Sequence, residues 1–93
     1  MARSTAVRKW VDFEIQAEPG SKVYICGTFN DWDSKQIRLH ERNKDGLFKT
    51  SLLLSKGRHE YKFVVNGEWR SDPKAQEWAP NSVGSANSVA VVE

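Results

Sequence analysis

Two tryptophans, Trp32 and Trp69, stand where a β-protein is expected to turn a polar corner. Trp32 ends the segment 27–32, Gly-Thr-Phe-Asn-Asp-Trp, and Trp69 follows shortly after the turn Asn66-Gly67. A large apolar ring at a loop or hairpin tip is poorly placed to reach the core. Two such flat rings could stack against a ligand with apolar faces and many hydroxyls, such as a sugar chain. The alternative interpretation, that each ring folds back over an edge of the sheet, stays open at this stage.

The turn Asn66-Gly67 also predicts which neighbours accompany Trp69. This dipeptide favours a two-residue type I′ hairpin turn, because both central residues need a positive φ. Such a turn pairs Val64 with Trp69, and paired residues share a face of the sheet. Since side chains alternate along a strand, Lys62 lies on the face of Trp69, whereas Phe63 points to the opposite face. We therefore expect Lys62 to lie outside the core together with Trp69, with Asn87 near them.

The sequence lacks the constellations that catalysis, metal binding or cofactor binding requires. His40 and His59 lie far apart with no histidine or cysteine at metal-ligand spacing, and no glycine-rich phosphate loop precedes a helix. Aspartates in turns commonly cap the local backbone, and four of them lie in predicted turns here: Asp31, Asp33, Asp45 and Asp72. We expect no catalytic residue, no metal and no cofactor.

The composition indicates one globular domain and excludes several classes of partner. The chain has 93 residues, of which 39% are hydrophobic and 28% charged. Its 14 basic and 12 acidic side chains give a net charge of +2, which is too balanced for a nucleic-acid binder. No apolar run approaches the roughly 20 residues of a membrane span. The N-terminus shows no apolar signal-peptide region, so a cytoplasmic location is expected. A lone cysteine, Cys26, is interpreted as a small buried hydrophobe.

The chain predicts an all-β fold, an immunoglobulin-like antiparallel β-sandwich of about seven to eight short strands. Alternating patterns and turn signals recur at the spacing typical of such sandwiches. Residues 1–8 are expected to form a flexible segment before a domain of residues 9–93. Residues 73–86 are interpreted as a long loop before a final strand, 87–92. Most of the remaining aromatic residues are expected in the core: Trp10, Phe13, Phe29, Phe48, Tyr61 and Phe63. Trp78 is interpreted as either a loop anchor or a surface contact.

Three segments together resemble the family 48 carbohydrate-binding modules. Residues 23–32, Val-Tyr-Ile-Cys-Gly-Thr-Phe-Asn-Asp-Trp, are similar to the opening signature of that family. Residues 59–69, followed by Asp72-Pro73, are similar to its central hairpin, and residues 83–89 to its closing segment. The similarity is greatest to the glycogen-binding domains of the β subunits of AMP-activated protein kinase, and it spans about residues 8–92.

The resemblance implies non-catalytic binding of α-1,4-linked glucan, either a polysaccharide such as glycogen or starch or a maltooligosaccharide. It implies roles for six residues: stacking by Trp32 and Trp69, hydrogen bonding by Lys62 and Asn87, and sugar contacts by Val83 and Ser85. The kinase-type domains have a leucine and a threonine where this chain has the smaller Val83 and Ser85. The rival hypothesis is a docking or structural module, in which the same tryptophans seal a contact with an enzyme domain or a kinase subunit.

Overall fold

The computed structural model describes residues 7–81 and 84–93, which form an all-β fold. All pairings between strands are antiparallel, and the only helical element is a single 3-10 turn, η1, in the part of the chain described. The elements are β1 (Arg8–Gln16), β2 (Val23–Gly27), η1 (Thr28–Asn30), β3 (Ile37–Glu41), β4 (Leu47–Ser55), β5 (Gly57–Val65), β6 (Glu68–Arg70), β7 (Glu77–Pro80) and β8 (Ala86–Val92). The expected all-β class and strand number are confirmed.

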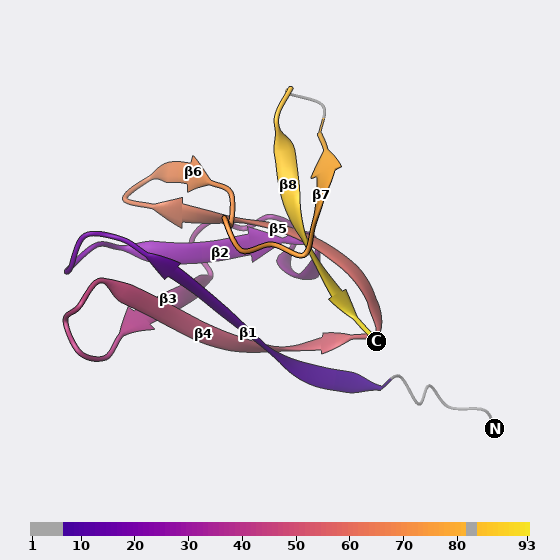
Figure 1. Cartoon of the computed structure of the whole chain (residues 1–93), viewed down its shortest axis with the longest axis horizontal. Coiled ribbons are helices and arrows are strands. Elements are labelled where there is room, and N and C mark those ends of the chain that lie inside the picture. The colour runs from indigo at the N-terminus through magenta and orange to yellow at the C-terminus, as the bar shows by residue number, and fades with distance from the viewer. Residues whose placement is uncertain (1–6, 82–83) are drawn as a thin grey trace.

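The strands form one strongly curled sheet in the order β1-β4-β3-β2-β5-β8-β7, with β6 paired to β5 (Figure 1). Strand β3 connects the two halves of this sheet. Its first residues, from Ile37 to Leu39, pair with β2, whereas His40 and Glu41 pair with β4. The halves that a sandwich would hold as separate layers are therefore continuous through β3.

Alternating residues on the inner side of the curl form the core. Phe63 is fully buried on β5, and the Tyr61 ring meets it edge-on at 5.8 Å between centroids. Phe13 from β1 meets Tyr61 from the other half at 4.9 Å. The buried cluster is made of Phe13, Ile15, Val23, Ile25, Leu39, Phe48, Leu54, Tyr61, Phe63, Val65, Ala90 and Val92, with Phe29 partly buried against it. These contacts close the curled sheet on itself.

Two expectations from the sequence are wrong. Residues 73–86 are not one long loop, because 77–80 form β7, which pairs with β8 and projects with it away from the other strands (Figure 1). Trp10 is not a core residue, since 70% of its surface is exposed. It lies opposite Leu53 on the outer face of β1 and β4, where the alternation that buries Phe13 must place it.

Both ends of the described domain meet at one corner. Arg8 at the start of β1 lies opposite Ser55, and Val92 at the end of β8 lies opposite Gly57. The turn between β4 and β5 thus holds the first and last strands. No helix in residues 7–81 or 84–93 has the length and apolar character needed to cross a membrane.

Candidate functional site

The hairpin of β5 and β6 presents Trp69 as the register predicts. Asn66 and Gly67 have φ values of 51° and 86°, the positive values that a type I′ turn requires. Val64 lies opposite Trp69, and Val65 lies opposite Glu68, so both predicted pairings are confirmed. Trp69 is 52% exposed, and its ring therefore remains available on the outer face of the sheet.

The tip of this hairpin is tied to the turn between β1 and β2. The Asn66 backbone N–H donates to the Lys22 carbonyl at 2.8 Å, and the Lys22 N–H donates to Asn66 Oδ1 at 2.9 Å. Asn66 Nδ2 also donates to Ser21 Oγ at 3.1 Å. Because Trp69 follows three residues after Asn66, these bonds limit the movement of the strand that carries the ring.

The loop that carries Trp32 is held close to β5 by Gly27. A Cβ on Gly27 would lie 2.2 Å from the Glu60 carbonyl oxygen, so a larger residue would push β2 away from β5. The Asn30 side chain accepts from the Gly27 N–H at 3.0 Å and donates to the Asp33 carbonyl at 3.1 Å. The Trp32 N–H donates to the Gly27 carbonyl at 2.9 Å. Gly27 lies opposite Tyr61, so this loop begins beside the centre of β5.

Trp32 itself has an uncommon backbone conformation. Asp31 and Trp32 have φ values of 54° and 60°, in the left-handed region that residues with a Cβ seldom adopt. Such conformations cost about 1–3 kcal/mol each and cluster at functional sites. Trp32 is half-buried, so part of its surface covers the protein and part faces solvent. The turn therefore fixes the direction of the ring at some cost in stability.

Lys62, Ser85 and Asn87 come together in one hydrogen-bonded group. Lys62 Nζ donates to Ser85 Oγ at 3.1 Å. Asn87 is only 9% exposed, and its Nδ2 donates to Glu60 Oε1 at 2.9 Å. Asn81 Nδ2 donates both to Asn87 Oδ1 at 3.0 Å and to Ser85 Oγ at 2.8 Å. The ammonium of Lys62 keeps donors that this group does not use.

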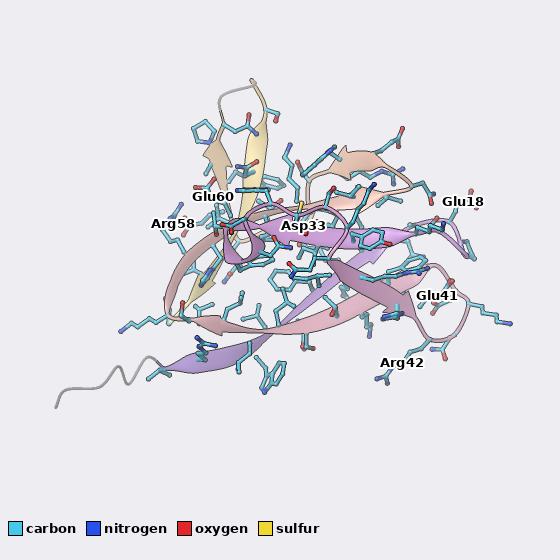
Figure 2. All side chains as sticks on the ribbon, turned by 180° about the vertical axis from the view of Figure 1, so that it is seen from behind. Glu18, Asp33, Glu41, Arg42, Arg58 and Glu60 are labelled. Carbon is cyan, nitrogen blue, oxygen red and sulfur yellow. The ribbon has the colours of Figure 1, made fainter. Side chains whose placement is uncertain are left out.

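Glu60 and Asn81 were missed by the sequence interpretation. They orient the Asn87 amide through bonds that span 27 and 6 residues of sequence, respectively. Glu60 could have been included, because it precedes Lys62 by two and must share its face. Figure 2 shows Glu60 on the side of β7 and β8, with Asp33 on the segment next to β2. Nothing in the sequence marks Asn81, whose role depends on the pairing of β7 with β8.

Val83 and Trp78 are the remaining residues that the sequence singled out near the site. Val83, for which the resemblance implies a sugar contact, lies outside the described residues. Trp78 belongs to β7 and lies opposite Ser88. It is 47% exposed, so it is a surface residue of a strand rather than of a loop.

Two buried titratable groups near the site, Cys26 and Tyr61, have raised pKa values. Burial raises the pKa of the Cys26 thiol to about 11, and the Asp33 carboxylate adds to this shift. Burial and the hydrogen bond to Asp72 also raise the pKa of Tyr61. Tyr61 Oη donates to Asp72 Oδ2 at 2.6 Å, and the Asp72 N–H donates to Ser88 Oγ at 2.8 Å. No group of three potential metal ligands occurs among the residues that the structure describes.

The geometry consists of an outward sheet face with an exposed aromatic ring, on a hairpin whose tip is hydrogen-bonded to the neighbouring turn, and a polar cluster. Residues 11–93 match the family described as the glycogen recognition site of AMP-activated protein kinase. The chain belongs to this family of non-catalytic glycogen recognition modules.

Individual relatives agree with this assignment. Subunit β-2 of the human 5′-AMP-activated protein kinase is 36% identical over 88 residues, which cover 95% of this chain and 28% of that protein. Subunit β-1 from pig is 32% identical over 74 residues, covering 80% of this chain and 57% of that sequence. The rice protein FLOURY ENDOSPERM 6, chloroplastic, is 42% identical over 59 residues, which cover 63% of this chain and 11% of that protein. The chain thus spans about a tenth of the rice protein and under a third of the human subunit.

Proposed function

We propose that this chain binds α-1,4-linked glucan without catalysis, through Trp32 and Trp69 as stacking platforms and Lys62 and Asn87 as hydrogen-bonding groups. The placement of Lys62 is the main structural support for glucan binding. It lies on the outer face of β5, two residues before Val64, which pairs with the exposed Trp69, and its Nζ donates to Ser85 Oγ. A polar cluster beside an exposed ring matches a ligand that has both hydroxyls and apolar ring faces.

The segments that carry the two tryptophans lie on opposite sides of β5. Trp69 belongs to β6, whereas the Trp32 loop leaves from Gly27 of β2. Their points of attachment, opposite Val64 and Tyr61, are separated by about 10 Å along β5 at the usual rise of a strand. Rings that approach from two sides suit a curved chain better than a flat one, and an α-1,4 glucan is curved.

Stacking supplies most of the binding free energy in this proposal. The C–H groups on the face of a glucose ring are attracted to the negative face of an indole. Lys62 and Asn87 orient the sugar, since hydroxyls exchange bonds with water for bonds with protein at little net gain. Ser85 and Val83 would contact the same chain. We expect a dissociation constant in the micromolar to millimolar range, because the open surface must offset the cost of association. Many sites on one polysaccharide would raise the avidity.

Calorimetry with two soluble glucans tests the proposal. Maltoheptaose should bind with a saturable heat and should change the tryptophan fluorescence. Cellohexaose, a flat β-1,4 chain, should bind at least about tenfold more weakly, which corresponds to about 1.4 kcal/mol. Equal or reversed affinities would exclude the angled arrangement of the two rings. No binding of maltoheptaose would exclude the function itself.

A second candidate function is docking to another domain or subunit. It is favoured by one observation outside the site: Trp10 and Leu53 lie opposite each other, both exposed, on the outer face of β1 and β4. Adjacent exposed apolar side chains are typical of contact surfaces. In a longer protein this surface could contact an enzyme domain or a kinase subunit, and it leaves the face of Trp69 free for glucan.

A further inference from the structure

A row of laterally paired residues crosses four strands on the outer face of the sheet and begins at Trp69. Trp69 on β6 lies opposite Val64 on β5, and Val64 lies opposite Tyr24 on β2. Tyr24 in turn lies opposite Arg38 on β3. Paired residues share a face, so these four side chains lie on the same outer surface. At about 4.8 Å between strands, Tyr24 is about 10 Å from Trp69 at the backbone.

The burial of Val64 indicates that the apolar surface along this row is continuous. Val64 points outward, yet only 6% of its surface is exposed. Its lateral neighbours in the sheet are Trp69 and Tyr24, both larger than valine. The Tyr24 ring is half-buried and keeps part of its surface open to solvent. An aromatic side chain thus flanks Val64 on each side.

The row ends in Arg38, a cation with no partner among the residues that the structure describes. Arg38 is exposed, and its guanidinium takes part in no hydrogen bond or ion pair within residues 7–81 and 84–93. Two other exposed arginines of the sheet differ, since Arg58 pairs with Glu77 and Arg70 with Glu68, whereas Arg8 at the start of β1 resembles Arg38 in this respect. A free guanidinium offers five N–H donors in a plane, which suits the vicinal hydroxyls of a sugar ring.

We propose that Tyr24 and Arg38 form an additional subsite that takes further glucose units of a longer α-glucan chain. Tyr24 stacks on one ring, and Arg38 donates hydrogen bonds to its hydroxyls. This inference rests on the proposed function, because the chain reaches Tyr24 only after occupying the surface of Trp69 and Lys62. The subsite makes the affinity depend on chain length: a short oligosaccharide fills the central site alone, and a long one also covers Tyr24.

Titrations with maltotriose and maltoheptaose test the subsite. Tyr24→Val keeps a β-branched residue on the strand and removes the ring. We expect it to weaken maltoheptaose binding by about tenfold, within the range for loss of one stacking ring, while maltotriose binding stays within about twofold. Arg38→Gln should weaken maltoheptaose binding by about threefold, consistent with a net hydrogen bond. Tyr24→Phe should retain the full affinity for the longer chain.

Arg42→Gln is the matched control, because Arg42 is exposed in the turn after β3, lies outside the row and also has no described partner (Figure 2). It should leave both affinities unchanged. An equal loss for the two sugars in Tyr24→Val, or no loss, would overturn the subsite. If Tyr24→Val does not fold, backbone NMR of the unaltered protein tests the subsite instead. Changes in the amide shifts of Tyr24 and Arg38 on adding maltoheptaose, but not maltotriose, support the subsite. The absence of these changes overturns the subsite.

The two proposals fail in different ways. If neither sugar binds the unaltered protein, the glucan-binding function is wrong and the subsite is wrong with it. If both sugars bind with the same affinity, the function stands and only the subsite is wrong. If Tyr24 and Arg38 instead contact a protein partner, the two sugars would bind with the same affinity.

Discussion

The two faces of strand β5 differ in chemistry, although both arise from the same alternation of side chains along the strand. On the inner face Tyr61, Phe63 and Val65 are almost fully buried against aromatic and aliphatic neighbours. On the outer face Glu60 and Lys62 take part in a polar cluster with Asn87 and Ser85. Apolar packing is non-directional, whereas hydrogen bonds near 3 Å also require a favourable angle. Apolar packing and polar hydrogen bonding thus alternate residue by residue along one strand.

The largest expected effect comes from the inner face. Phe63→Ala should destabilise the domain by about 3–5 kcal/mol, because removal of a fully buried ring leaves a cavity. Chemical denaturation followed by circular dichroism measures this change. An unchanged midpoint would mean that the inner face of β5 contributes little, and the distinction between the faces would then be lost.

The outer face should respond in the opposite way. Trp69→Ala is expected to weaken maltoheptaose binding by about 1–3 kcal/mol, the range seen when a stacking ring is lost. The fold should stay intact, because the ring is 52% exposed and the strand keeps its backbone pairs. Calorimetry gives the affinity and thermal unfolding gives the control. A variant that unfolds, or one that binds normally, contradicts the assignment.

Cys26 is an exception to this difference between the inner and outer faces. It lies opposite Lys62 on the outer face but is fully buried. Its raised pKa, about 11, means that the folded state holds the thiol proton more tightly than the unfolded chain, for which the reference value is 9.0. The associated stability is present below pH 9 and is lost as the pH rises through 11. We expect the free energy of unfolding to fall by about 1 kcal/mol between pH 9 and 10 from this group.

Urea denaturation at a series of pH values measures that loss. Cys26→Ala serves as the control, and its stability should fall less over the same interval. Equal slopes for the two proteins would mean that the thiol is as accessible as the rest of the outer face.

The smallest effect is expected far from β5, at Trp10. Trp10→Ala should change the free energy of unfolding by no more than about 0.5 kcal/mol, because the side chain is 70% exposed. Glucan affinity should be unaltered. A loss above about 2 kcal/mol in thermal unfolding would show that the outer face of β1 and β4 is structural after all.

Local signals made the hairpin of β5 and β6 predictable, and long-range pairing explains most of what was missed. Asn66-Gly67 determines its own turn and therefore the face of Trp69. Strand β7 has four residues and ends in Pro80, so it carries almost no local strand signal and exists through its pairing with β8. The position of Trp10 follows from the alternation along β1, which here overrides the general preference of aromatic residues for the core.

In the candidate site, too, locally determined features were predictable from the sequence and long-range contacts were not. The placement of Lys62 beside Trp69 was predictable, because both depend on one turn. The bond between Asn87 and Glu60 joins residues 27 apart in sequence, and no local pattern encodes it. The left-handed backbone at Trp32 also escaped the sequence interpretation, since nothing in a tryptophan favours a positive φ.

The corner where Arg8 and Val92 meet the turn of residues 55–57 has a consequence for how such a domain can be carried. Lys62 and Val64 lie five and seven residues along β5 from Gly57, which is about 17–23 Å at the usual rise. A tether attached at either end would therefore leave from a point remote from Trp69. Because the two ends are adjacent, the domain could be inserted into a host protein whose chain would enter and leave it at one place. A short linker could also join the two ends in a circular permutant.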